Sequence, residues 1–108
     1  MFHYTDEDGF KAIRAHPVWV FKATQPHGEH PRGAYFTALP PDTVNLAKRL
    51  RIPKTKIAFV FCFRDAPDLK PLEGGRGAFI FYSPDDYTVQ KDRQIDHGPS
   101  EEVRERLP

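Results

Sequence analysis

One stretch of this chain limits its fold more than any other: Ile57–Phe63, whose residues Ile-Ala-Phe-Val-Phe-Cys-Phe are all apolar. Alternate residues of a β-strand point to opposite faces of a sheet, so a strand that is apolar on both faces has to be covered on both. The stretch is far shorter than the roughly 20 residues that a helix needs to span a bilayer. It therefore predicts a central strand in a layered domain.

Short elements are expected around this strand, because 11 prolines in 108 residues is about twice the average share of roughly 5%. Two helices are predicted, one with Thr5 as its N-cap and an end before Pro17, the other running from Pro40 to about Ile52. Ser100 is predicted to cap a final helical turn. Further strand patterns occur at 2–4, 18–23, 33–39, 78–83 and 87–90. The predicted helices are too few to cover both faces of a parallel sheet. We therefore predict a single α+β domain over residues 1–108.

The charge of the chain is nearly balanced, with 16 Lys and Arg against 15 Asp and Glu. Bulk capture of nucleic acid normally needs a large excess of basic residues, so the composition does not favour that class. One basic cluster could contact a phosphate, although a solvated helix end explains it as well. It consists of Lys48, Arg49, Arg51, Lys54 and Lys56.

The single cysteine, Cys62, excludes an internal disulfide and a zinc site made of cysteines alone. Its place inside an apolar strand predicts a buried thiol rather than a nucleophile. The first residues show no basic stretch followed by an apolar core, so they do not form a secretory signal. We therefore expect a cytoplasmic protein in a reducing compartment, with no membrane partner.

Most motifs that carry chemistry are absent from the sequence. Gly74-Gly75-Arg76-Gly77 lacks the spacing and the lysine of a phosphate-binding loop, and there is no Gly-x-Ser-x-Gly elbow. His27-Gly28-Glu29-His30 has residue types that bind metals, but the flanking prolines exclude the helix that would hold both imidazoles on one face. We expect a solvated loop there and no bound metal.

Three other segments are more informative together than singly. They are His3-Tyr4-Thr5, then Gly33-Ala34-Tyr35-Phe36-Thr37 just before Leu39-Pro40-Pro41, then Asp86-Tyr87-Thr88-Val89. This order resembles the ADP-ribosyltransferase superfamily, and it is most similar to the compact branch of bacterial toxin-type domains with a His-Tyr-Asp signature. The similarity is densest over Phe2–Asp42, and the third segment contributes a single acid.

The resemblance implies an ADP-ribosyltransferase-like fold, in which two small, strongly bent sheets surround an NAD cleft with helices on the flanks. It implies that His3 binds a ribose hydroxyl of the adenosine half of NAD and that the ring of Tyr35 stacks on the nicotinamide. Asp86 would hold the nicotinamide ribose, with Asp85 left open as the alternative acid. A fixed carboxylate suits this position because breaking the N-glycosidic bond builds positive charge on the sugar. The further NAD-binding positions implied are Tyr4, Thr5, Gly33 and Thr37.

The function that follows is that of a mono-ADP-ribosyltransferase or an NAD glycohydrolase, with NAD as substrate. The acceptor stays open between protein, nucleic acid, small molecule and water. Two alternatives remain. One is a catalytically inactive relative that binds a nucleotide or a partner protein. The other is a small nucleic-acid-binding domain that uses the basic residues at 48–56 and exposed aromatic side chains. Release of nicotinamide would distinguish the first function from both alternatives.

Overall fold

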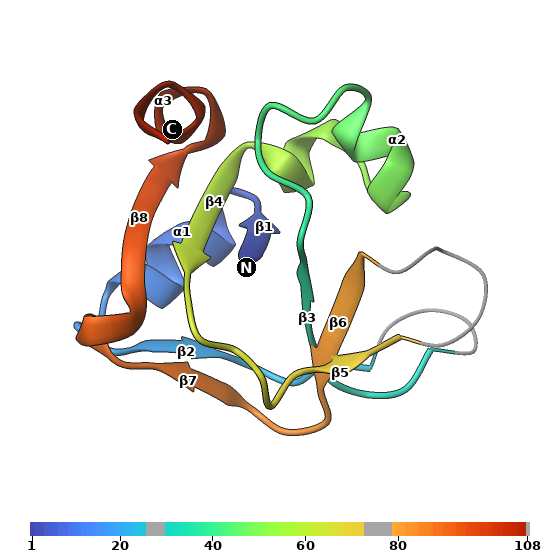
Figure 1. Ribbon diagram of the computed structural model, residues 1–108, viewed down its shortest axis with the longest axis vertical. Helices are drawn as coiled ribbons and strands as arrows, with labels where there is room; N and C mark the ends of the chain where they lie inside the picture. The colour runs from blue at the N-terminus through green and yellow to red at the C-terminus, as the bar shows by residue number, and fades with distance from the viewer. Residues whose placement is uncertain (26–29, 73–78, 108) are drawn as a thin grey trace.

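Two antiparallel sheets form the framework of the protein in the computed structural model, which describes residues 1–25, 30–72 and 79–107 (Figure 1). The larger sheet has the strand order β5 (Lys70–Pro71), β6 (Ile80–Ser83), β3 (Ala34–Thr37), β1 (Phe2–Thr5), β4 (Phe59–Phe63) and β8 (Gln94–Pro99). The smaller sheet pairs β2 (Trp19–Phe21) with β7 (Tyr87–Val89). The α-helices in the described ranges are α1 (Glu7–Arg14), α2 (Leu46–Leu50) and α3 (Ser100–Arg106), and two short 3-10 helices lie at Lys54–Ile57 and Lys91–Arg93. This arrangement confirms the predicted α+β class.

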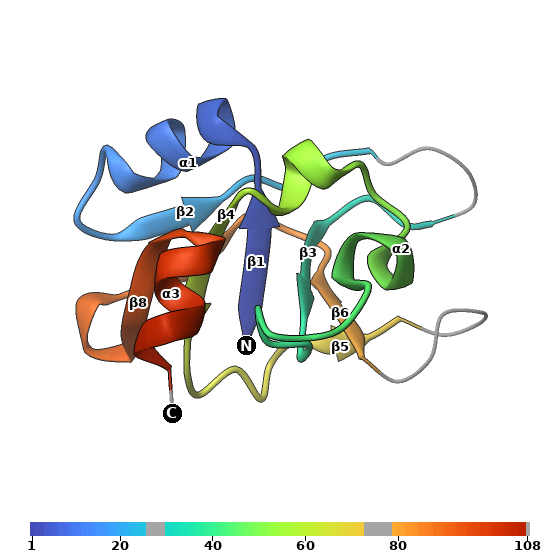
Figure 2. The same ribbon diagram turned by 90° about the horizontal axis from the view of Figure 1, so that it is seen from above.

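The larger sheet is covered on both faces, as the apolar stretch around β4 predicts. Towards the smaller sheet, Phe61 and Phe63 pack into an aromatic core with Trp19 and Phe21. The helix α1 lies on this side, beside β2, and contributes Phe10 to the same core (Figure 2). On the other face, α3 packs against β4 and β8, and α2 covers β3 and β6 through a second apolar cluster (Figure 1). The buried position of Cys62 is confirmed.

The start of α1 differs by one residue from the prediction. Thr5 is the last residue of β1, where it pairs with Phe59, and the N-cap is Asp6, whose Oδ1 accepts the Gly9 N–H at 2.9 Å. Strand pairing therefore takes precedence over the capping preference of Thr5. The helix can start this close to the strand because residue 9 is a glycine: a Cβ there would lie 2.0 Å from the Oγ1 of Thr5.

The second helix is much shorter than the predicted span of 40–52. Its first part is replaced by a turn, in which the N–H and Oγ1 of Thr43 both donate to the carbonyl of Pro40, at 3.1 and 2.7 Å. Only Leu46–Leu50 is helical, and the residues on either side, Asn45 and Arg51, both have a φ of 57°. These left-handed residues end the helix at both termini.

The strand β8 is missing from the prediction, and the helix after it is longer than predicted. Ser100 is the first residue of α3 rather than its cap, and its Oγ donates to the carbonyl of Ile57 at 2.5 Å. The strand β5 lies outside the predicted strand patterns. No helix of the described ranges is both long and apolar enough to cross a membrane.

Candidate functional site

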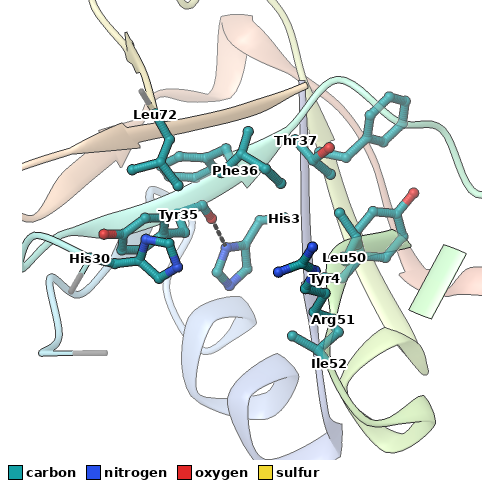
Figure 3. A pocket seen from close by; sticks show the side chains of 12 residues that line it. His3, Tyr4, His30, Tyr35, Phe36, Thr37, Leu50, Arg51, Ile52 and Leu72 are labelled. Atoms are coloured by element: carbon teal, nitrogen blue, oxygen red, sulfur yellow. Dashed lines mark hydrogen bonds between the residues drawn. The ribbon is translucent and has the colours of Figure 1, made fainter. Parts of the chain in front are cut away.

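The strands β1 and β3 are neighbours in the larger sheet but separate along most of their length. A single residue pair, Phe2 with Thr37, joins them, whereas β1 pairs with β4 and β3 pairs with β6 over four residues each. Beyond that pair, a side chain takes the place of the missing backbone bonds: Nδ1 of His3 lies 2.9 Å from the carbonyl oxygen of Tyr35 (Figure 3). His3 therefore links the two strands at the point where they separate.

The bond to Tyr35 fixes which ring nitrogen of His3 carries a proton. A carbonyl oxygen can only accept, so Nδ1 carries the proton and donates. The ring lies against Phe21 and Phe36, at centroid distances of 4.7 and 5.6 Å. Burial lowers the pKa of His3 from 6.5 to about 4, although the bond to the Tyr35 carbonyl opposes the shift. At neutral pH the imidazole is therefore uncharged, and its Nε2 is a hydrogen-bond acceptor without a partner among the described residues.

A pocket of about 390 Å³ opens where β1 and β3 separate (Figure 3). Most of the lining residues are apolar or aromatic. They come from β1, β3, β6 and the end of α2, with one residue from the segment before β3 and one that follows β5. The described lining contains no carboxylate, and its only permanently charged side chain is that of Arg51. The lining residues are Phe2, His3, Tyr4, His30, Tyr35, Phe36, Thr37, Leu50, Arg51, Ile52, Leu72 and Ile80.

The ring of Tyr35 is held in a fixed orientation beside His3. It stacks on Tyr82, with a centroid distance of 5.8 Å and an interplanar angle of 20°, and its hydroxyl donates to the carbonyl of Pro31. The ring of His30 lies edge-on to it, with a centroid distance of 6.5 Å. Burial raises the pKa of Tyr35, so the phenol stays protonated at neutral pH. The pocket therefore has a rigid aromatic wall on the β3 side.

Tyr4 and Thr37 also line the pocket, but their hydroxyls bond to the backbone. The Tyr4 hydroxyl donates to the carbonyl of Leu39 at 2.8 Å, and burial raises the pKa of this phenol. The Thr37 hydroxyl donates to the carbonyl of Phe79 at 2.7 Å and accepts the Leu39 N–H at 3.1 Å. These two residues shape the pocket and position the segment after β3.

Thr5 and Gly33, also predicted to bind NAD, are not among the lining residues. Thr5 contacts the first turn of α1. Gly33 forms a β-bridge with Thr24, and a Cβ at residue 33 would lie 2.5 Å from the carbonyl oxygen of Ser83. Close backbone packing explains this glycine, and the NAD-binding roles of both residues stay predictions.

Asp86, the predicted catalytic acid, lies between β6 and β7 and is not among the lining residues. Its Oδ1 accepts the Ala23 N–H at 2.8 Å, and its Oδ2 lies 3.3 Å from Nζ of Lys22. The bond from Ala23, followed by the one from Lys22, lowers the pKa of Asp86, which keeps the carboxylate ionised. The structure thus brings His3 and Tyr35 together in one pocket and places Asp86 outside its lining. Its catalytic role stays a prediction.

Sequence reasoning did not place two lining residues in a common site. The sequence groups His30 only with His27 and Glu29, as a candidate metal site. Those two residues lie outside the described residues, and the described part of the chain holds no group of three metal-binding side chains. Arg51 was one of five basic residues in a predicted helix end. No local pattern distinguishes it from its neighbours, because its position depends on where α2 ends.

These groups together suit an organic ligand. The pocket offers a flat aromatic wall, an imidazole acceptor for a hydroxyl group and a guanidinium for an anion, in mostly apolar surroundings. Comparison of the chain with protein-family models, with curated proteins and with solved structures found no match. The chemistry of the pocket and the order of the sequence motifs are therefore the basis for a function.

Proposed function

We propose that the pocket binds NAD and that the protein is a mono-ADP-ribosyltransferase or an NAD glycohydrolase, which cleaves the bond between nicotinamide and ribose. One observation carries the proposal: His3 bonds to the backbone of Tyr35 across the separation of β1 and β3, and both side chains border one pocket. These are the residues that the resemblance to the ADP-ribosyltransferase superfamily assigns to NAD. The split between the strands is where an ADP-ribosyltransferase-like cleft would lie.

The groups around the pocket have the chemistry that this ligand requires. Nε2 of His3 accepts a hydrogen bond from a hydroxyl of the adenosine ribose, because Nδ1 holds the only proton of the neutral ring. The ring of Tyr35, fixed by Tyr82 and Pro31, provides the stacking surface for nicotinamide. The pocket volume of about 390 Å³ falls within the range of roughly 300–1,000 Å³ usual for small-molecule sites.

In the proposed reaction, Asp86 stabilises the positive charge that develops on the nicotinamide ribose. Its carboxylate is ionised and held in place by the Ala23 N–H and Lys22. Ser83, three residues before it, pairs with Ala34, next to Tyr35, so the Asp86 turn adjoins the Tyr35 end of β3. In this arrangement the nicotinamide ribose extends from the pocket towards that turn.

A second candidate function is nucleotide binding without catalysis. It is favoured by the absence of a carboxylate from the described lining of the pocket, and by the bonds that already occupy the carboxylate of Asp86. Such a protein would retain NAD affinity through His3 and Tyr35 and would release no nicotinamide. The two candidates therefore differ in one measurable product.

The test is incubation of the protein with NAD, followed by chromatography of nicotinamide and ADP-ribose. We expect release by the wild type and a decrease of about 10²-fold in Asp86→Asn, the scale for loss of one charge-stabilising group. Asp85→Asn is the matched control, because Asp85 is the exposed neighbour in the same turn. A larger loss in Asp85→Asn than in Asp86→Asn would assign the acid to residue 85.

Calorimetry with NAD separates the two candidates. Binding without nicotinamide release in the wild type would support the non-catalytic function, and the absence of both would refute both candidates. Free ADP-ribose as the main product indicates water as the acceptor. Mass spectrometry of a lysate incubated with the protein and NAD identifies any other acceptor.

A further inference from the structure

Arg51 ends α2 in a backbone conformation that favours a different residue. Its φ of 57° and ψ of 44° are left-handed, and its N–H bonds to the carbonyls of Ala47 and Lys48. Glycine is the usual residue at such a helix end, because it has no Cβ to clash in this conformation. The helix cap needs only the backbone of residue 51, so the cap does not explain an arginine there.

The side chain of Arg51 extends into the pocket, where it borders the same space as the ring of His3 (Figure 3). No hydrogen bond, ion pair or ring contact joins its guanidinium to another residue of the described chain. Its basic neighbours differ: the guanidinium of Arg49 lies 5.2 Å from the centroid of Phe79, and Nζ of Lys56 lies 2.6 Å from a carboxylate oxygen of Asp6. Of these three cations, Arg51 alone faces the pocket and has no partner among the described residues.

The electrostatic character of the pocket follows from this one side chain. The described lining holds no Asp or Glu, and His3 is uncharged at neutral pH because burial lowers its pKa. A single positive charge beside apolar walls is screened less than one on an open surface. A guanidinium can donate two parallel hydrogen bonds to a phosphate, and this geometry makes arginine well suited to binding one. The pocket is therefore suited to a ligand with an anionic group next to the part that His3 contacts.

We infer that Arg51 binds the diphosphate of the ligand and makes the pocket selective for diphosphate-containing nucleotides over nucleosides. This inference rests on the proposed function, in which His3 contacts the adenosine ribose of NAD. In NAD the diphosphate is attached to that ribose, so a cation beside His3 lies where the diphosphate would be. Arg51 is thus a specificity-determining residue, contributed by a helix end that the sequence alone does not place at the site.

The decisive variant is Arg51→Gly, because it removes the guanidinium and introduces the residue that the backbone conformation favours. Loss of binding in this variant cannot be ascribed to a weakened helix end. The matched control is Arg49→Ala, which removes a guanidinium two residues away that lies against Phe79. Calorimetry is carried out with NAD, ADP and adenosine, the last of which lacks the diphosphate, and nicotinamide release is measured in parallel.

We expect Arg51→Gly to weaken binding of NAD and ADP by about 10-fold or more, the scale of a charge-assisted hydrogen bond. Adenosine affinity should be unchanged in Arg51→Gly, and Arg49→Ala should bind all three ligands like the wild type. The NAD and ADP affinities of the wild type should also fall as salt is added, and those of Arg51→Gly should fall less.

The outcomes separate this inference from the proposed function. If Arg51→Gly binds NAD as tightly as the wild type and the wild type releases nicotinamide, the inference is wrong and the proposed function stands. The inference is also wrong if adenosine affinity falls as much as NAD affinity. If the wild type binds ADP through Arg51 but neither binds nor cleaves NAD, the diphosphate site stands and the proposed function is wrong. A wild type that binds neither ADP nor NAD overturns both.

Discussion

Burial of the His3 imidazole makes the stability of the fold depend on pH. The pKa of His3 falls from 6.5 in the unfolded chain to about 4 in the native protein, because its ring is desolvated. Between these two pH values the unfolded chain binds a proton that the native protein does not. The contribution of neutral His3 to stability is therefore complete above about pH 6.5 and is lost progressively as the pH falls towards 4.

The size of this effect follows from the difference in pKa. The difference between 6.5 and about 4 corresponds to about 3 kcal/mol at about 1.4 kcal/mol per unit. At about pH 5 roughly 2 kcal/mol of this would already be lost. Carboxylates with lowered pKa values, those of Asp6, Asp86 and Asp96, lose their contribution only as the pH falls through 3.8 and below. Between about pH 7.5 and about pH 5, the contribution of His3 to stability therefore changes while those of these three carboxylates do not.

Urea unfolding at about pH 7.5 and about pH 5 measures this difference. The single tryptophan, Trp19, is buried and reports unfolding by its fluorescence. The control is His3→Asn, whose amide can donate to the Tyr35 carbonyl and does not titrate. The wild type should lose about 2 kcal/mol more than His3→Asn between the two pH values. Equal losses in the two proteins, or an NMR titration of His3 with a midpoint near 6.5, would refute the reasoning.

Three further changes test the packing around the pocket. Tyr35→Ala should weaken NAD binding by about 10-fold in calorimetry, because roughly 1 kcal/mol or more of stacking is lost, whereas Tyr35→Phe should keep most of the affinity. Equal affinities in the wild type and both variants would contradict the stacking role. Gly33→Ala should lower the free energy of unfolding by about 1–3 kcal/mol, because its Cβ would lie 2.5 Å from the Ser83 carbonyl oxygen; an unchanged urea midpoint would contradict this. Arg51→Gly should raise the free energy of unfolding by about 1 kcal/mol by removing a left-handed arginine, and a lower melting temperature would argue against it.

The strands that the sequence predicts are those with apolar or aromatic residues. The predicted strand patterns contain β2, β3, β4, β6 and β7, because strands that are buried in the core need apolar or aromatic residues. The sequence of β8, Gln-Ile-Asp-His-Gly-Pro, is mostly polar because it forms an edge of the larger sheet, and Ile95 is 52% exposed. What holds β8 in place is pairing with β4 and the stacking of His97 on Phe61. Neither contact leaves a local pattern in the sequence.

The helix boundaries depend on contacts that local preferences do not include. Thr5 is a good N-cap residue, but its pairing with Phe59 keeps it in β1 and moves the cap to Asp6. The prolines at 40 and 41 suit the first turn of a helix, yet the bonds from Thr43 to Pro40 form a separate turn before α2. In both places a competing hydrogen bond decides the boundary.

The candidate site was predicted in part. The motif order led to His3 and Tyr35, which the structure places on one pocket, and to Asp86, which lies outside its lining. Arg51 could not be singled out, because its direction depends on the left-handed backbone that ends α2 at this residue. The residue at which α2 ends therefore decides which of several similar cations lines the pocket.

The position of β1 has a consequence for how the chain acquires its structure. The first strand in sequence lies in the interior of the larger sheet, and four of its residues pair with four residues of β4 nearly sixty positions later. Contacts this distant in sequence slow folding, because the entropy lost on closing the long intervening loop opposes their formation. During synthesis β1 therefore stays without its main partner until residue 59 and those after it are available. A fragment ending at residue 56 would contain His3, Tyr35 and Arg51 but would lack β4, β6 and the lining residues Leu72 and Ile80. We therefore expect the pocket to form only when the sheet closes.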